Sequence, residues 1–151
     1  MKRRHFSMSL LALMVLLLTV SCDPLVGGVG EWDGEQIPLG TDVVYDISPG
    51  SGAYEIHSFT TDAAGDYRIT VSDFSAEASL LWYLFASESD AVDYFRGTDL
   101  PNLVIAEGNE VLENPQTALA EGLSGDTTYY LGIQDFSGVG SDYTINVAAA
   151  D

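Results

Sequence analysis

Apolar and polar residues alternate along most of the chain after Thr41. The pattern is clearest in three stretches, near residues 67–71, 129–133 and 143–147, where aromatic and branched aliphatic residues occupy every second position. A period of two turns successive side chains to opposite faces of an extended strand, so the pattern predicts β-strands. Gly, Asp, Asn and Ser separate these stretches, as expected of turns. The sequence therefore predicts an all-β fold, an antiparallel jelly-roll-like β-sandwich.

The alternation and the turn residues together predict a series of short elements. Strands are expected over 42–48, 54–60, 67–72, 80–86, 103–106, 117–119, 129–133 and 143–147. A short helix is expected over 90–96, with Ser89 as its N-cap, because a serine hydroxyl can accept a hydrogen bond from the first turn. The side chains of Tyr67, Ile69, Tyr129, Leu131, Tyr143 and Ile145 should share one core between two sheets.

Residues 80–86 are apolar on both faces, which is typical of a central strand. Trp82 and Tyr83 lie on opposite faces of this strand, so at most one of them belongs to the main core. An exposed ring at either position could stack on a sugar, which makes both candidate ligand-binding residues. Burial of both is favoured, since apolar residues surround them.

The amino terminus has the three parts of a secretory signal. Lys2, Arg3 and Arg4 precede an apolar stretch from Leu10 to Val20, and the small residue Ser21 follows. This stretch is shorter than the roughly 20 residues that a membrane-spanning helix needs. We therefore predict that residues 1–21 are a cleaved signal peptide, with an uncleaved signal anchor as the alternative.

The segment Thr19-Val20-Ser21-Cys22 resembles the lipobox of bacterial lipoproteins, although that motif usually begins with Leu. The resemblance implies cleavage before Cys22, acylation of this cysteine and attachment to a membrane of the bacterial cell envelope. Cys22 is the only cysteine of the chain, so it has no intramolecular disulfide partner. The alternative is an ordinary signal peptide followed by a chance cysteine. Asp23 resembles a signal for retention in the inner membrane, but the choice of membrane stays open.

Composition divides the rest of the chain in two. Residues 22–40 are rich in Gly, Pro and acids, so we expect a flexible lipidated tether there, with Trp32 docking on the domain edge. Residues 41–151 are expected to form one sandwich domain.

The 23 acidic residues all follow Cys22, and removal of residues 1–21 leaves Arg68 and Arg96 as the strong bases. Twenty-three acids against two arginines give the mature chain a net charge of −21. A field of this sign repels nucleic acid and anionic lipid headgroups, so nucleic-acid binding is not expected.

Three stretches carry a resemblance to a known family. They are residues 64–71, 125–133 and 138–147, and the form Asp-Tyr-x-Ile-x-Val occurs in both the first and the last. In order and spacing they resemble the bacterial pre-peptidase C-terminal domain. That resemblance implies a small jelly-roll-like sandwich of the kind appended to secreted proteases. This chain departs from the family pattern at Glu77-Ala78-Ser79, where acids ahead of the central strand are usually Asp.

The sequence contains no clear catalytic constellation. His57 is the one histidine after the predicted cleavage site, and it lies inside an expected strand. A catalytic triad would have to use it, yet no nucleophile elbow surrounds any serine. The several His or Cys ligands that zinc needs are missing after Cys22. A paired-carboxylate glycosidase would need a cleft, which a domain of this size rarely provides.

Calcium is the metal most compatible with the composition, because it binds carboxylate and carbonyl oxygens. Asp135 and Asp142 stand at the two ends of a glycine-containing loop, and Asp62 and Asp66 flank another turn. Neither pair has the spacing of an EF-hand. Acids in turns usually serve as caps, so calcium binding by these four residues is a hypothesis beside that alternative.

Three functions fit these observations. The first is a lipid-anchored module that binds an extracytoplasmic glycan, envelope polymer or protein. The second is a structural accessory domain of an envelope complex, for which calcium is a candidate stabilising ion. The third, a hydrolase, is the least favoured.

Overall fold

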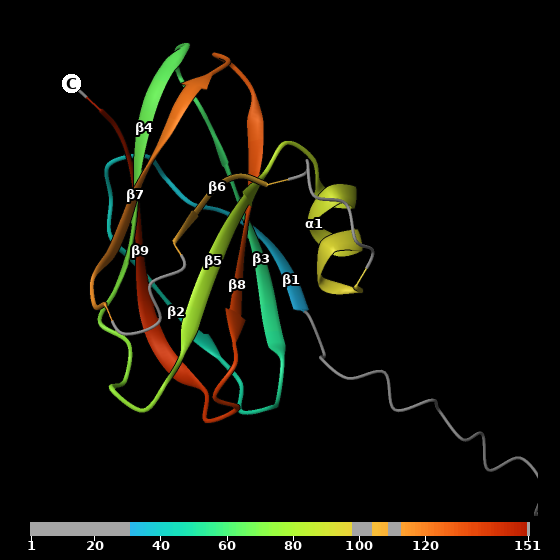
Figure 1. Ribbon diagram of the computed structural model, residues 1–151. Helices are drawn as coiled ribbons and strands as arrows, with labels where there is room; N and C mark the ends of the chain where they lie inside the picture. The colour runs from blue at the N-terminus through green and yellow to red at the C-terminus, as the bar shows by residue number, and fades with distance from the viewer. Residues whose placement is uncertain (1–30, 98–103, 109–112, 151) are drawn as a thin grey trace, which may run out of the picture.

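The computed structural model describes residues 31–97, 104–108 and 113–150 as a two-layered β-sandwich with one short helix at its side (Figure 1). The predicted signal peptide and Cys22 lie outside these residues. The elements are β1 (Glu31–Gln36), β2 (Val43–Ile47), β3 (Ala53–Thr60), β4 (Gly65–Ser72), β5 (Leu80–Phe85), α1 (Glu88–Phe95), β6 (Val104–Gly108), β7 (Gln116–Leu123), β8 (Thr128–Asp135) and β9 (Ser141–Ala149).

The strands form two sheets whose order in space differs from their order in the chain. The five-stranded sheet has the order β1-β3-β8-β5-β6, and the four-stranded sheet has the order β2-β9-β4-β7. Neighbouring described strands are antiparallel except for β1, which runs parallel to β3. The predicted all-β antiparallel sandwich is therefore confirmed, with one parallel edge strand added.

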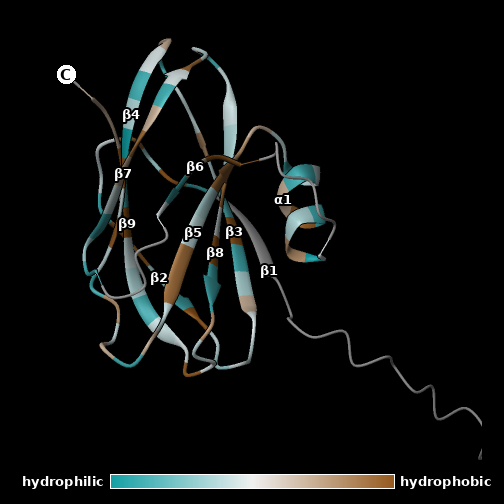
Figure 2. Ribbon diagram, viewed as in Figure 1, coloured by the Kyte–Doolittle hydropathy of each residue, from teal (hydrophilic) through white to brown (hydrophobic). Residues whose placement is uncertain are grey.

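The interior between the sheets is built from the alternation seen in the sequence. The six residues expected to share a core all belong to one buried cluster, and Ile69, Leu131, Tyr143 and Ile145 are fully buried within it. The two Asp-Tyr-x-Ile-x-Val stretches are neighbours, since β4 and β9 pair with Ile69 opposite Val147. Strongly apolar β5 is an interior strand of its sheet, between β8 and β6 (Figure 2). Because water is removed from apolar side chains on both inner faces, this interior supplies the main stabilisation of the fold.

Buried tyrosines close the turns at one end of the sandwich. The hydroxyl of Tyr67 donates to the carbonyl oxygen of Ala63 at 2.9 Å, and the hydroxyl of Tyr129 accepts from the amide of Ser124 at 2.8 Å. Each ring is buried in the core while its hydroxyl reaches a loop, as an amphipathic side chain requires. We call this end, with residues 61–64 and 124–127, the far end.

Helix α1 covers the outer face of the five-stranded sheet (Figure 1). A second apolar cluster lies beneath it, with Ile56, Tyr83, Phe85 and Ala91 buried. The N-cap of α1 is Ser87, whose hydroxyl accepts a hydrogen bond from the amide of Asp90 at 3.2 Å. The prediction of Ser89 was therefore wrong, because Ser87 has the extended backbone that a cap requires. No helix in the described part of the chain is long and apolar enough to cross a membrane.

Two boundaries differ from expectation for identifiable reasons. Strand β1 lies within the segment 22–40 that was expected to be a flexible tether, and it pairs Trp32 with Ile56. Backbone pairing with β3 holds it there without an apolar alternation in its own sequence. Strand β7 extends to Leu123, beyond the expected residues 117–119. Its last part was missed because two exposed residues, Glu121 and Gly122, separate the buried Ala120 and Leu123 and interrupt the alternation.

Candidate functional site

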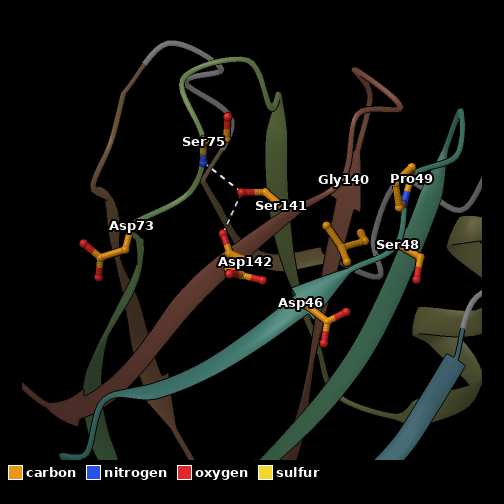
Figure 3. A pocket seen from close by; sticks show the side chains of 9 residues that line it. Asp46, Ser48, Pro49, Asp73, Ser75, Gly140, Ser141 and Asp142 are labelled. Carbon is orange, nitrogen blue, oxygen red and sulfur yellow. Dashed lines mark hydrogen bonds between the residues drawn. The ribbon is translucent and has the colours of Figure 1, made fainter.

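An open hollow lies at the end of the sandwich opposite the far end. Three connections meet there, namely residues 48–52 between β2 and β3, residues 73–79 after β4, and residues 136–140 between β8 and β9; we call this the loop end (Figure 1). The hollow has a volume of about 560 Å³. Its lining consists of Asp46, Ile47, Ser48, Pro49, Asp73, Ser75, Gly140, Ser141 and Asp142 (Figure 3).

Acids and hydroxyls dominate this lining. Asp46 and Asp142 are directly opposite each other on the paired strands β2 and β9, and both are exposed. Like charges in such a cross-strand pair disfavour the fold slightly. On the other side, the hydroxyl of Ser141 accepts from the amide of Ser75 at 2.8 Å and donates to the carbonyl oxygen of Asp142 at 2.6 Å (Figure 3). The hollow therefore presents negative charge on a framework fixed by backbone hydrogen bonds.

Asp135 organises the loop beside the hollow. Its Oδ1 accepts from the amide and the hydroxyl of Ser137 at 2.8 and 2.6 Å, and its Oδ2 accepts from the amide of Gly140 at 2.9 Å. Burial alone would raise the pKa of Asp135, but hydrogen bonds from Ser137, Gly140 and Ser79 together hold it below its usual value. The carboxylate of Asp135 thus stabilises the conformation of the loop that follows it.

The four acids considered for calcium are distributed over both ends. Asp135 and Asp142 belong to the loop end, where Asp135 already has three donors. Asp62 and Asp66 belong to the far end, and Asp66 accepts from the amide of Gly122 at 2.8 Å. Within residues 31–97, 104–108 and 113–150, no three acidic, histidine or cysteine side chains are grouped so that they could hold a metal ion. Calcium binding stays a prediction.

Trp82 and Tyr83 face opposite sides of β5, as the strand pattern predicted. Trp82 is fully buried in the main core, and Tyr83 is buried beneath α1 with its ring centroid 4.8 Å from that of Tyr94. Burial and the neighbouring Tyr94 raise the pKa of Tyr83. Neither ring lies on a surface where a sugar could stack, so burial of both, the favoured alternative, describes this structure.

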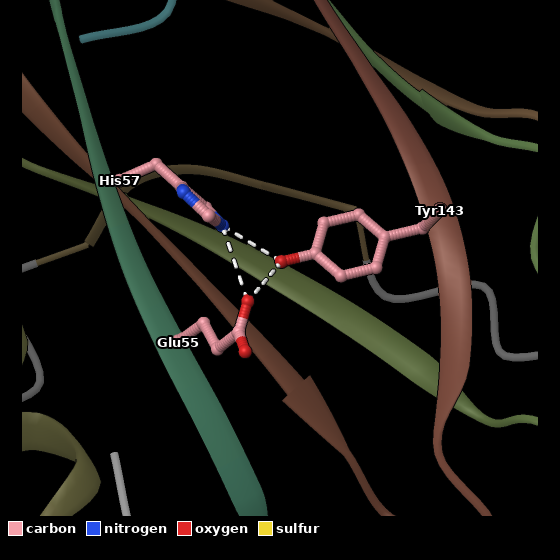
Figure 4. Close-up of polar contacts among 3 residues, drawn as sticks. All are labelled: Glu55, His57 and Tyr143. Carbon is pink, nitrogen blue, oxygen red and sulfur yellow. Dashed lines mark hydrogen bonds and ion pairs between the residues drawn. The ribbon is translucent and has the colours of Figure 1, made fainter. Parts of the chain in front are cut away.

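A polar cluster connects the two sheets inside the sandwich (Figure 4). The hydroxyl of Tyr143 on β9 donates to Oε2 of Glu55 at 2.7 Å. Nε2 of His57 lies 2.7 Å from the same hydroxyl oxygen and 3.7 Å from Oε2 of Glu55. With the Tyr143 proton donated to Glu55, the tautomer of His57 that fits this geometry carries its proton on Nε2 and donates it to the hydroxyl oxygen of Tyr143. The ring of Tyr45 lies against the ring of His57, with 4.1 Å between their centroids.

This cluster binds its own members and keeps the imidazole of His57 away from the surface, while the side chain of Glu55 is 20% exposed. His57 is 1% exposed and its imidazole is enclosed by Tyr45, Tyr143 and Glu55. A general base must come within hydrogen-bond reach of a substrate proton. The arrangement therefore stabilises contact between the sheets.

The outer face of the four-stranded sheet carries a row of hydroxyl and amide side chains. Thr70 on β4 stands between Asn146 on β9 and Thr117 on β7 in the sheet register. The hydroxyls of Thr70 and Thr117 are 3.1 Å apart, and the amide nitrogen of Asn146 donates to Asp42 at 2.6 Å. We call Asp42, Thr70, Thr117 and Asn146 the polar sheet face.

Sequence reasoning anticipated some of these residues and missed others. Asp135 and Asp142 were singled out as candidate calcium ligands, and His57 as the histidine that a catalytic triad would have to use. Asp46 and Asp73 were not connected with Asp142, since they come from separate segments and no local motif marks them. Glu55 was missed as the partner of Tyr143, because the two residues are far apart in the sequence.

No family model matches the chain, and no curated protein matches it in sequence. Solved structures do match. The pre-peptidase C-terminal domain of a collagenase from Bacillus anthracis aligns with 79% of this chain and 96% of its own, at 21% identity and a TM-score of 0.56. PliG of Aeromonas hydrophila, a periplasmic inhibitor of g-type lysozyme, aligns with 81% of this chain and 100% of its own, at 7% identity and a TM-score of 0.50. At these identities the likeness establishes the fold: the chain has the β-sandwich architecture of these bacterial domains.

Proposed function

We propose that this chain is an exported protein held to a bacterial envelope membrane through lipid on Cys22, with its sandwich acting as a non-catalytic binding module. The module would bind an extracytoplasmic glycan, envelope polymer or protein. The amino-terminal charge, apolar stretch and lipobox-like segment support the anchor. The likeness to the collagenase domain and to PliG supports an extracytoplasmic module.

The burial of His57 carries the non-catalytic part of this proposal. It is the one histidine after the predicted cleavage site, and its imidazole is committed to Tyr143 and Glu55 inside the core. Acid–base catalysis by histidine would require opening the contact between the sheets. The hydrolase therefore remains the least favoured function.

The polar sheet face supports the binding part. Its hydroxyl, amide and carboxylate groups lie on one side of a pleated sheet, at the regular spacing of neighbouring strands. Glycans and extended peptides both offer hydrogen-bonding groups at repeated intervals, so this surface suits either. The alternative is a structural accessory domain of an envelope complex that binds no small ligand, with calcium adding stability.

Binding can be measured with the mature chain, residues 22–151, on a glycan array and on isolated envelope polymers. We expect saturable binding that weakens when Thr70 and Thr117 are both replaced by Val, since Val keeps the shape and removes the hydroxyls. The matched control replaces Thr60 and Thr128 by Val, because these two threonines form the same kind of hydroxyl pair, 2.9 Å apart, on the five-stranded sheet.

Equal binding by the Val variant and wild type would exclude the polar sheet face as the site. Absence of binding to every glycan, polymer and cross-linked envelope protein would favour the structural alternative. Release of a product that Glu55→Gln or His57→Ala abolishes would revive the hydrolase.

A further inference from the structure

The loop end carries two exposed apolar side chains in one short connection. Phe136 is 53% exposed and Val139 is 47% exposed, and both lie between β8 and β9. Single exposed apolar residues are common on soluble domains. Two exposed apolar side chains in one loop, at the end of the domain and beside an acidic hollow, favour contact of this loop with a membrane or another molecule.

The connection holds these side chains on a stiff frame. The carboxylate of Asp135 accepts from two backbone amides and one hydroxyl of the loop, and the amide of Phe136 donates to the carbonyl of Ser79 at 3.0 Å. Gly140 packs so closely that a Cβ there would lie 2.7 Å from the carbonyl oxygen of Ile47. A rigid loop loses little conformational entropy when it docks.

The chain enters the sandwich nearer to this end. Strand β1 runs parallel to β3 and pairs Glu31 with Glu55, only two residues after β3 begins at the loop end. Nine residue steps separate Cys22 from Glu31, which limits their distance to about 32 Å when fully extended. The eight residues of β3 alone span about 26 Å. A lipid on Cys22 would therefore attach the domain to the bilayer near its loop end, and the loop end reaches the bilayer with a shorter linker than the far end needs.

We propose that the loop of Phe136 and Val139 rests on the bilayer surface and inserts these two side chains between the headgroups. This inference rests on the proposed lipid anchor. The anchor keeps the loop at a high local concentration beside the membrane, so two apolar side chains suffice for contact.

The acids of the hollow determine which lipid surface fits. Asp46, Asp73 and Asp142 are the charged residues of the lining, and all three are exposed. They repel anionic headgroups, whereas the outward ammonium groups of zwitterionic lipids complement them. The occupant of this surface is thus a zwitterionic bilayer. The polar sheet face and the far end then stay available to a partner.

Tryptophan depth measurements test the contact. The chain from residue 22 onward, which keeps every described residue, is coupled through its single cysteine to a maleimide lipid in phosphatidylcholine vesicles. In a Trp32→Phe background, Phe136→Trp reports the loop, Val139→Trp is a second loop probe, and Val44→Trp is the control on the outer sheet face, where Val44 is 69% exposed. The buried Trp82 stays in every variant, so its signal is measured in the background chain alone and subtracted. Brominated acyl chains are expected to quench the loop probes about twofold, since interfacial apolar groups lie roughly 5–10 Å into the headgroup boundary.

The control probe should be quenched little, and replacing part of the phosphatidylcholine by an anionic lipid should reduce quenching of the loop probes. Equal quenching of loop and control probes would overturn the contact. Quenching that grows with anionic lipid would overturn the zwitterionic assignment. Coupling through a maleimide makes this result independent of natural acylation, which mass spectrometry of the native chain tests separately.

Discussion

Single side chains decide the local order of this protein where the backbone leaves the sheets. Asp135, Tyr67 and Tyr129 each satisfy backbone groups of a loop, and Tyr143 satisfies a carboxylate across the core. Buried polar groups need such partners, because an unpaired one costs about 1–3 kcal/mol. The alternating pattern predicted which rings are buried. It could not predict their hydroxyl partners, since these come from distant segments.

Asp135→Asn should destabilise the fold by about 1–3 kcal/mol, because one amide NH₂ would face a backbone or hydroxyl donor of the loop. The pKa of Asp135 is lowered in the folded chain, so its ionisation stabilises the fold above the unfolded value of about 3.9. This contribution is lost as the pH falls from there through the lower folded value. Urea unfolding between pH 2 and 7 measures both effects.

The variant should depend less on pH in that acidic range than wild type does. Asp62→Asn, at an exposed position, is the control. An unchanged acid dependence in Asp135→Asn would show that the loop hydrogen bonds do not hold this carboxylate.

At the scale of elements, close packing positions α1 on the five-stranded sheet. Gly132 of β8 lies directly under Phe95, and a Cβ at Gly132 would be 2.2 Å from Cε2 of that ring. The ring of Phe95 also stacks on Tyr54, with 4.6 Å between centroids and an angle of 11°. The ring of Phe95 therefore occupies the space that a side chain at residue 132 would fill, and this contact positions α1 on the sheet.

Gly132→Ala should destabilise the protein by about 1–3 kcal/mol through overpacking against Phe95. Phe95→Ala removes the clash, so the same substitution should cost less in that background. Urea unfolding of the wild type, both single variants and the double variant measures the difference. An equal cost of Gly132→Ala with and without Phe95 would contradict this account of helix docking.

The elements that could be predicted from sequence are those with two apolar faces or strict alternation, such as β4, β5, β8 and β9. Strand β1 was not predicted because only Trp32 among Glu31–Gln36 is a large apolar residue, and pairing with β3 defines it. The helix expected over 90–96 overlaps α1 but begins two residues too late, since Ser87 and Ser89 are both suitable caps and backbone geometry selects between them. The hollow depends on contact between three connections, which no local pattern encodes.

The whole molecule combines a dense core with a very acidic exterior. After the predicted cleavage site the chain has twenty-three acidic residues and two arginines. Its electrostatic field therefore attracts cations and repels anions. Such a charge also destabilises the compact state by self-repulsion, and salt should relieve this.

The calcium hypothesis belongs to this scale, because a bound ion would stabilise the entire domain. It predicts that millimolar Ca²⁺ raises the Tm of residues 22–151, with about 2.7 kcal/mol gained at a hundredfold excess over Kd. Equal ionic strength supplied by NaCl separates binding from screening. Asp142→Asn and Asp66→Asn assign any effect to the loop end or the far end, and a Tm that Ca²⁺ and NaCl change equally would reject the hypothesis.

The proposed function depends on attachment of the chain through Cys22. The most direct test is mass spectrometry of the protein extracted from bacterial membranes, beside a Cys22→Ser variant. We predict a chain that begins at Cys22 and carries diacylglycerol on its sulfur, while the variant is not acylated. A membrane-extracted protein that still begins at Met1, with an unmodified thiol at Cys22, would contradict the account.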